Sequence, residues 1–259
     1  MVSLTDDCKE VALANGADMA GVVKAADLPE HSESLANILP GVDSVLVLAV
    51  GHNRTALSSE NTQVMQLETS FTYAEATRAA KSVERFLSRR GDPSVSVPAF
   101  LPVDMAAPKY GLKGEICWRR AAVRAGLGSY GMNGLLVTKR FGSAVRLSGV
   151  VTAAELTPDA PLSENVCTLC GQCLQACPAA ALSGEGPVNK RLCGPSAMKF
   201  GFNQFKSILG KLASGSNEEK SEILDSRHLR ELWQTFITGS YYYCARCQTQ
   251  CPVNDPLDR

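Results

Sequence analysis

The sequence predicts a mixed helix-and-sheet chain, α/β or α+β, and we take α+β as its fold class. In the first 160 of the 259 residues, short apolar runs typical of strands alternate with stretches of helical periodicity, without internal repeats. The remainder concentrates cysteine, with eight of the ten cysteines between positions 167 and 251. At roughly 150 residues per domain, this length suggests one large domain or two modest ones.

The expected elements follow from apolar spacing and from helix stop signals. The helix over 72–90 places Val83, Phe86 and Leu87 on one face and ends at Gly91. Further helices are expected at 6–15 and 119–125, and strands at 17–23, 44–50, 134–138 and 145–151. Two amphipathic helices, around 198–212 and 222–238, are expected near the C-terminus with a solvated polar loop from Ser214 to Lys220 between them.

Composition and the N-terminus limit the function classes. Lys and Arg together number 26, and Asp and Glu together also number 26, so the formal net charge is zero. This balance disfavours a general nucleic-acid binder. The first residues show no secretory signal, and the longest strongly apolar run, 45–50, is far shorter than a membrane span. We therefore predict a cytoplasmic protein without membrane contact. In a reducing compartment, ten cysteines indicate metal or redox chemistry over disulfides.

The cysteine spacing identifies the chemistry. The run Cys167-x2-Cys170-x2-Cys173-x3-Cys177-Pro has the spacing of bacterial ferredoxins, in which three thiolates bind one [4Fe–4S] cube and the fourth ligates another cluster. A second group, Cys244-x2-Cys247-x3-Cys251-Pro, has Cys193 upstream as a possible fourth member. Applying the same rule twice predicts two ligand sets. Set one is Cys167, Cys170, Cys173 and Cys251, and set two is Cys177, Cys193, Cys244 and Cys247.

Two zinc sites, each with four thiolates, are the alternative interpretation of these cysteines. Zinc favours paired C-x2-C knuckles, and a continuous run with a proline after the last cysteine fits that pattern poorly. Two cubes whose ligands cross over in this way are expected to lie close together and to form an electron relay.

A glycine segment resembles a nucleotide-binding motif but lacks its context. Gly126-Leu-Gly128-Ser-Tyr-Gly131 satisfies G-x-G-x-x-G. The dinucleotide fingerprint needs a strand before it, a helix after it and an acidic residue about 20 positions on. Here a helix is expected before the glycines and a strand after them, and positions 146–151 contain no acidic residue. The glycines are instead expected to let the backbone approach a flat cofactor closely or to form a turn.

The segment Ala125-Gly-Leu-Gly-Ser-Tyr-Gly-Met-Asn-Gly-Leu-Leu-Val-Thr, with Phe141-Gly and Val145-Arg-Leu after it, resembles the corrinoid-binding core of the epoxyqueuosine reductase and reductive dehalogenase superfamily. The two cysteine groups with Cys193 resemble the double-cluster domain of that family. Pro102-Val-Asp104-Met-Ala resembles the stretch holding its catalytic aspartate, and Tyr73 falls where the family carries an active-site tyrosine.

This resemblance implies a nitroreductase-like, cobalamin-binding domain over 1–160 and a ferredoxin-like domain with two [4Fe–4S] clusters over 161–259. The clusters would deliver electrons to a base-off cobalamin, and Asp104 as general acid and Tyr73 as hydrogen-bond or proton donor would serve the substrate. An electron donor such as ferredoxin or flavodoxin is implied. The residues implied to contact the corrinoid are Gly126, Gly128, Gly131, Asn133, Gly134 and Leu135.

The sequence is compatible with three functions. The first is a cytoplasmic cobalamin-dependent reductase of an unidentified small substrate. The second is a short epoxyqueuosine reductase acting on tRNA, which the zero net charge and the end of the chain at Arg259 disfavour. The third is a ferredoxin-like electron carrier, or an activator that reduces the corrinoid of another protein.

Several residues have open roles beside these. Cys8 is expected to be an inert thiol on an early helix, and Cys117 a buried thiol or one that faces the cofactor cavity. His52 is expected to be a hydrogen-bonded loop histidine or to lie at the mouth of a site. The arginines at 119, 120 and 124 are expected to face solvent, a corrin amide or an anionic substrate. The three tyrosines at 241–243 are expected to shield the clusters from water.

Overall fold

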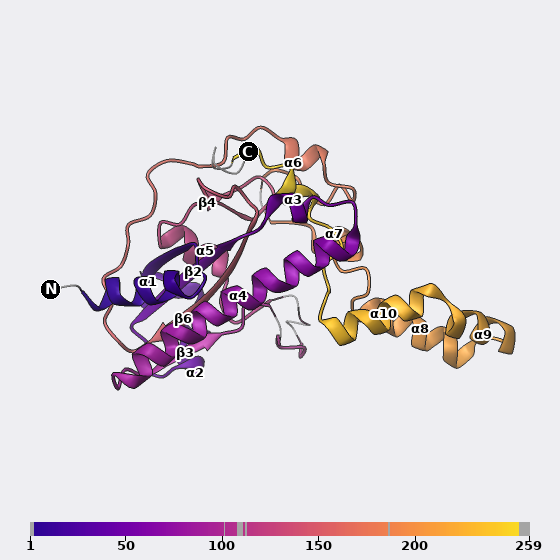
Figure 1. Cartoon of the computed structure of the whole chain (residues 1–259), viewed down its shortest axis with the longest axis horizontal. Helices are drawn as coiled ribbons and strands as arrows, with labels where there is room; N and C mark the ends of the chain where they lie inside the picture. The colour runs from indigo at the N-terminus through magenta and orange to yellow at the C-terminus, as the bar shows by residue number, and fades with distance from the viewer. Residues whose placement is uncertain (1–2, 101, 108–110, 112, 186, 254–259) are drawn as a thin grey trace.

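The computed structural model describes residues 3–100, 102–107, 111, 113–185 and 187–253. Its centre is a four-stranded antiparallel sheet in the order β1 (Met19–Lys24), β2 (Ser44–Gly51), β6 (Val145–Thr152) and β3 (Ser94–Val97) (Figure 1). The antiparallel sheet and its covering helices confirm the predicted α+β class.

Both faces of the sheet are buried, and strand β2 shows why. Its side chains alternate between two cores, as the period of two in a strand requires. Leu46 and Leu48 join the core under helices α1 (Leu4–Ala14) and α4 (Thr62–Arg89). Val47 and Ala49 join the core under α5 (Trp118–Arg124). A strand buried on both faces reads as a continuous apolar run, which is how the sequence predicted it.

Helix α4 is longer than the sequence predicted, because it begins at Thr62 and not at position 72. The Asn61 side chain caps it by accepting hydrogen bonds from the backbone N–H groups of Gln63 and Val64. The polar residues Thr62, Gln63 and Gln66 in its first turns interrupt the apolar periodicity that marked the rest of the helix. Strand β3 was not predicted from the sequence.

Smaller elements connect this body to the cysteine region. A two-stranded hairpin joins β4 (Ser129–Tyr130) to β5 (Leu136–Val137), and the predicted strand over 134–138 is reduced to β5. The remaining short helices are η1 (Ala25–Asp27), η2 (Pro29–His31), α2 (Ser32–Ile38), α3 (Arg54–Leu57), α6 (Gln172–Gln175), α7 (Lys190–Ala197) and α11 (Arg246–Thr249).

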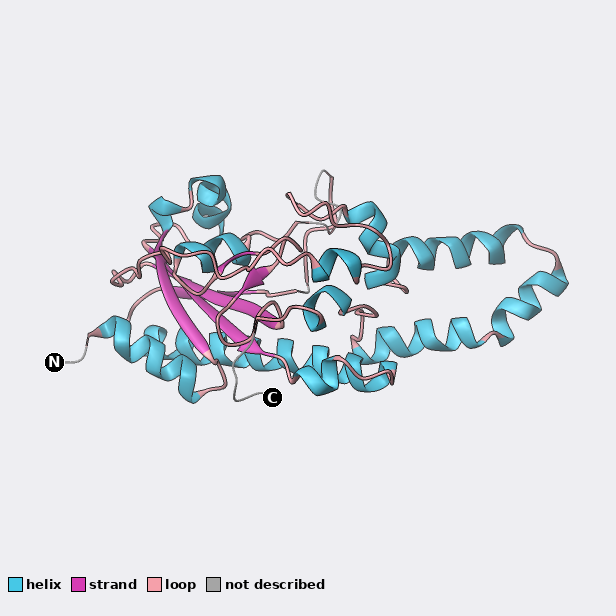
Figure 2. Ribbon diagram, turned by 90° about the horizontal axis from the view of Figure 1, so that it is seen from above, coloured by secondary structure: helices cyan, strands magenta, loops and turns pink. Residues whose placement is uncertain are grey.

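A helical arm projects from the body between Cys193 and Cys244 (Figure 2). It comprises α8 (Phe202–Ser214), α9 (Asn217–Asp225) and α10 (Arg227–Thr238). The predicted loop over 214–220 is wrong in its second half, because Ser216 and Glu219 form a capping box that starts α9. The predicted helix over 222–238 is broken at Ser226, which caps α10.

Within the described residues, no helix is both long enough and apolar enough to cross a membrane. The domain boundary at 160 remains a prediction. Residues just before it are tied to the sheet body, since Asp159 accepts hydrogen bonds from Lys9 and from the backbone of Val22.

Candidate functional site

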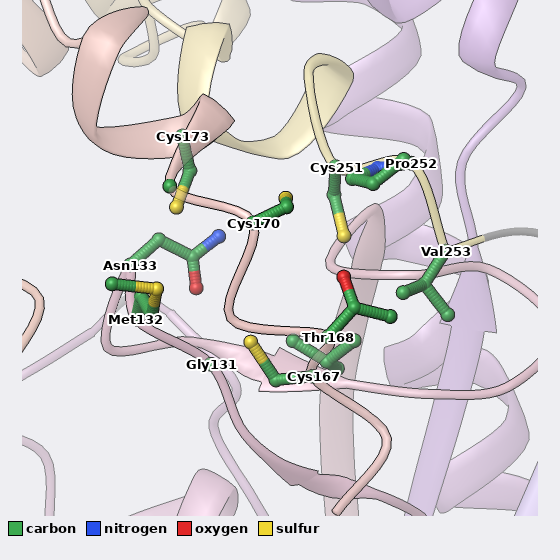
Figure 3. A pocket seen from close by; sticks show the side chains of 12 residues that line it. Gly131, Met132, Asn133, Cys167, Thr168, Cys170, Cys173, Cys251, Pro252 and Val253 are labelled. Carbon is green, nitrogen blue, oxygen red and sulfur yellow. The ribbon is translucent and has the colours of Figure 1, made fainter.

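Set one lines a single cavity. Cys167, Cys170, Cys173 and Cys251 surround it together with the glycine-rich segment from Gly131 to Asn133 (Figure 3). Three of these cysteines come from the ferredoxin-like run, and Cys251 reaches the cavity from the far end of the chain. The structure thus brings together the four cysteines that spacing assigned to the first cluster.

Local backbone geometry shapes this cavity. Ser129 Oγ accepts hydrogen bonds from the backbone N–H groups of Val166 and Cys167, which holds the start of the run against the β4–β5 hairpin. Gly142 has a positive φ of 56°, and a Cβ there would lie 2.0 Å from the Val253 oxygen and 3.1 Å from Cys251 Sγ. The missing side chain at Gly142 therefore makes the space in which Cys251 sits.

Set two is recognised by the charges that its members exert on one another. Burial, with smaller contributions from Cys244, Cys193 and Cys177, raises the pKa of the Cys247 thiol to about 12. Burial also raises the pKa of Cys193, with contributions from Cys244 and Cys177. Such thiols lose their protons when they bind metal, so the group suits a metal cluster.

The two sets are adjacent, because Cys173 of set one also acts on Cys247 of set two. In the described part of the chain, no three His, Cys, Asp or Glu side chains converge on one point as a single metal ion would require. A [4Fe–4S] cube carries its irons at separate corners and takes one thiolate at each. An all-sulfur donor set around a cavity therefore fits a cube, and the ligand assignment remains a prediction.

The glycines implied to meet the corrinoid instead pack against the chain itself. A Cβ at Gly126 would lie 2.4 Å from the Ala160 oxygen, and one at Gly128 would lie 2.3 Å from the Val137 oxygen. Gly134, with a φ of 68°, lies between β4 and β5, and its carbonyl accepts a hydrogen bond from Arg119. Packing and turn geometry thus account for these three positions, and their contact with a corrinoid remains a prediction.

Asn133 belongs to the cysteine region. It is buried, and its side-chain amide donates to Ser143 Oγ (3.0 Å) and to the Cys247 carbonyl (3.2 Å). Its side-chain oxygen accepts from the backbone N–H of Leu135. One side chain thus lines the set-one cavity and holds the backbone that carries set two.

Tyr73 and Asp104, the predicted catalytic residues, have different surroundings. The Tyr73 ring stacks on Phe100 (5.1 Å between ring centres), and its hydroxyl lies 3.3 Å from that of Tyr242. The Arg146 guanidinium lies over both tyrosine rings, at 4.9 and 5.0 Å. Asp104 is exposed in a loop, where its carboxylate accepts a hydrogen bond from the Ala106 backbone. Tyr73 is therefore already part of a packed polar cluster beside set two.

A buried network that the sequence did not reveal lies behind this cluster. His52 Nδ1 lies 3.0 Å from Glu68 Oε1 and 3.0 Å from Thr72 Oγ1, while Nε2 is buried without a described partner. Burial lowers the pKa of His52 to about 4, so His52 is neutral at pH 7. Burial raises the pKa of Glu68, but hydrogen bonds from His52, Asn53 and Thr72 outweigh it and hold the pKa below its ordinary value. Only the position of His52 after a strand hinted at this site.

The remaining residues that the sequence singled out agree in part with the surroundings expected for them. Cys8 is fully buried and burial raises its thiol pKa to about 11, which agrees with an inert core thiol. Cys117 is half-buried before α5. Arg124 is paired with Glu30 at 2.7 Å. Tyr242 and Tyr243 pack on aromatic neighbours beside the cysteines.

Comparison with known families defines the class of the cysteine region. The sequence model of the 4Fe-4S binding domain matches residues 160–183, the segment that holds Cys167 to Cys177. The predicted [4Fe–4S] cofactor is thereby confirmed for this segment. The chain is an α+β protein with an iron–sulfur binding segment.

Its relatives are reductases, and the predicted resemblance is confirmed. The chain is 33% identical over 141 residues to an epoxyqueuosine reductase of Listeria monocytogenes, a match covering 54% of the chain and 30% of that relative. It is 51% identical over 67 residues to a tetrachloroethene reductive dehalogenase of Desulfitobacterium hafniense, covering 25% of the chain and 12% of that relative. The matched region thus spans less than a third of these relatives.

Solved structures show the same fold. A crystal structure of epoxyqueuosine reductase with an epoxyqueuosine-modified tRNA-Tyr stem loop has a TM-score of 0.56 at 22% identity, covering 97% of this chain and 65% of that one. A reductive dehalogenase structure that suggests a mechanism for B12-dependent dehalogenation has a TM-score of 0.53 at 17% identity. It covers 69% of this chain and 25% of that one. The fold is therefore shared with both groups of enzymes.

Proposed function

We propose that this protein is a cobalamin-dependent reductase in which sets one and two each hold a [4Fe–4S] cluster. The observation that carries the proposal is the gathering of eight cysteines into two adjacent groups, with Cys173 close enough to act on Cys247. Adjacent clusters pass single electrons, and a bound corrinoid would supply the metal-centred reducing chemistry. The B12-dependent dehalogenation described for a structural neighbour supports cobalamin as the second cofactor.

This chain's own residues would serve the substrate beside set two. Tyr242 lies two positions before Cys244, and its hydroxyl meets that of Tyr73. Arg146 places a fixed positive charge over both rings. Tyr73 is thus oriented to donate a hydrogen bond at this end of the relay, and Asp104 would supply the proton as general acid.

Epoxyqueuosine in tRNA is the substrate that the relatives favour, since the epoxyqueuosine reductase of L. monocytogenes matches more than half of the chain. A small halogenated compound is the second candidate, favoured by the higher identity of the shorter match to a tetrachloroethene reductive dehalogenase. A ferredoxin or flavodoxin would serve as electron donor in either case.

Anaerobic reconstitution with cobalamin tests the cofactors first. We expect about eight irons per chain, matching sulfide and one retained corrinoid. Zinc, or about four irons, contradicts the two ligand sets. Eight irons without retained corrinoid contradicts the reductase and leaves an electron carrier.

The loaded protein, with reduced flavodoxin, is then given epoxyqueuosine-containing tRNA or tetrachloroethene in parallel. Formation of queuosine, measured by nucleoside mass spectrometry, supports the first substrate, and release of chloride supports the second. Asp104→Asn is expected to lower the rate of the active reaction about a hundredfold, as loss of a general acid does. An unchanged rate contradicts that role for Asp104.

A further inference from the structure

Arg54 connects the sheet body to the cysteine that closes set one. It is the first residue of α3, directly beyond strand β2. Its Nη2 donates to the carbonyl oxygen of Thr249 at 2.8 Å and to that of Cys251 at 2.7 Å. These acceptors lie 195 and 197 positions away in the sequence. One guanidinium therefore fixes the turn that carries Cys251 into the cavity.

Helix α3 has a second contact with the same region, which makes the position of Arg54 definite. Leu57, at the other end of α3, packs in a buried cluster with Ala144 and with Ala245, which lies between two cysteines of set two. The N-terminus of α3 is capped by the Asn53 side chain. The guanidinium is thus held by a helix that is anchored at both ends.

The other amino group of the Arg54 guanidinium, Nη1, takes part in neither of these hydrogen bonds. Nη1 is buried and has no hydrogen-bond partner in the part of the chain that the structure describes. An arginine is always charged, and each of its N–H groups needs an acceptor when it is buried. Carbonyl oxygens satisfy Nη2, but they do not balance the charge. An anionic acceptor beside Cys251 would do both.

We infer that Arg54 is a positioning residue for the first iron–sulfur cluster. Its Nη1 would donate a hydrogen bond to a sulfur atom of the cluster that Cys251 would ligate, and its charge would raise the reduction potential of that cluster. A cube held by four thiolates is an anion, and reduction adds another negative charge, so a nearby cation favours the reduced form. This inference rests on set one of the proposed function.

Arg146, the arginine beside set two, makes different contacts from those of Arg54. Its Nη1 donates to Gln248 Oε1, and its charge lies over the faces of Tyr73 and Tyr242. Aromatic faces attract a cation and engage its charge. Arg54 lacks such a neighbour among the described aromatic contacts, so its charge remains available to set one.

Redox titration of the reconstituted full chain, followed by EPR, tests the inference. The variants are Arg54→Met, which removes charge and donors, and Arg54→Lys, which keeps the charge and loses the fork. Arg89→Met is the matched control, because Arg89 is exposed at the far end of α4 and carries the same charge. Cys193→Ser, expected to retain only the first cluster, assigns the two signals.

Iron content is measured before any potential. Fewer than eight irons in the unmodified chain contradicts the ligand sets of the proposed function, and this role of Arg54 with them. With eight irons present, Arg54→Met is expected to lower the ratio of reduced to oxidised first cluster about tenfold at a fixed potential, which is about 59 mV for a one-electron couple. Arg54→Lys should shift it less, and Arg89→Met should leave it unchanged.

Two outcomes overturn the inference. If Arg54→Met retains eight irons and both potentials, Arg54 only holds the carbonyl groups at the end of α11. If Arg54→Met loses the first cluster, Arg54→Lys decides: a lowered first potential supports the hydrogen bond to sulfur, and an unchanged potential contradicts it.

Discussion

The two cysteine sets lie next to each other but are assembled in different ways. Set one consists of a continuous run plus Cys251, and residues of the sheet body hold both parts, among them Ser129 and Arg54. Set two combines Cys177, the last cysteine of that run, with Cys193 from α7 and two cysteines that follow the helical arm. The sheet body and its hairpin therefore position the first set. The second set forms only if the chain, after passing through the arm, comes back beside Cys193.

Contacts at the base of the arm make that return possible. The Tyr243 backbone N–H donates to the Ala197 carbonyl at 2.9 Å, and the Tyr243 hydroxyl lies 2.9 Å from Thr235 Oγ1. Phe200 is buried against the Tyr243 ring. Because the chain is closed at this base, Cys193 and Cys244 can lie close in space although they are 51 positions apart in the sequence. Lengthening a closed loop costs little additional entropy.

Removing one ligand of set two is expected to cause the largest change, because it should remove one cluster and leave the other in place. Cys193→Ser is expected to lower the iron content from about eight to about four per chain, because the second cube loses a thiolate while set one is untouched. Iron and sulfide analysis with EPR measures this. Cys117→Ser, which removes a cysteine outside both sets, should keep all eight irons. A Cys193→Ser chain with both clusters intact would show that Cys193 is not a ligand.

The body's control over set one is tested at Gly142. Gly142→Ala forces a positive φ on alanine and places Cβ against the Val253 oxygen and Cys251 Sγ, so we expect a loss of roughly 2–4 kcal/mol in unfolding free energy and of the first cluster. Gly41→Ala is the matched control. Gly41 lies outside the cysteine cavity and has a φ of 76° with open space around its Cβ position, so strain alone should cost about 1 kcal/mol.

Urea denaturation and iron analysis of both variants provide the measurements. Equal losses in Gly142→Ala and Gly41→Ala would mean that glycine's tolerance of a positive φ, and not the space beside Cys251, is what Gly142 supplies.

The sequence predicted set one and the sheet better than it predicted the buried polar residues, and the reason is physical. Cysteine spacing and alternating apolar residues are local patterns that survive in any context. The orphaned amino group of Arg54 and the pairing of His52 with Glu68 arise only when distant segments meet. The arm was predicted as two helices because its apolar periodicity was visible, but the cap at Ser226 that divides the second helix was not recognised.

The His52 network provides a pH test of the segment that leads to α3. Burial holds the pKa of His52 at about 4, against 6.5 for an exposed histidine. Its facing groups are Glu68, Thr72 and Arg146. Above pH 6.5 both folded and unfolded chains hold His52 neutral. As pH falls from 6.5 to 4, only the unfolded chain gains the proton, so up to about 3 kcal/mol of stability is lost.

The difference between the unmodified chain and His52→Asn isolates this contribution, since acid affects the clusters of both proteins. Urea denaturation at several pH values should show a steeper loss below pH 6.5 in the unmodified chain. Parallel pH profiles would mean that His52 is not the group responsible.

The smallest expected effect concerns the aromatic cover of set two. Tyr73→Phe keeps the ring stacked on Phe100 and under Arg146 but removes the hydroxyl that meets Tyr242. Loss of one hydrogen bond in the transition state corresponds to about a tenfold lower rate of substrate reduction. The iron content and both cluster potentials should not change, because the ring remains. Single-turnover rates with pre-reduced protein separate this effect from electron delivery. If the rate is unchanged, Tyr73 acts as packing; if a cluster potential shifts instead, Tyr73 belongs to the surroundings of set two and not to the substrate.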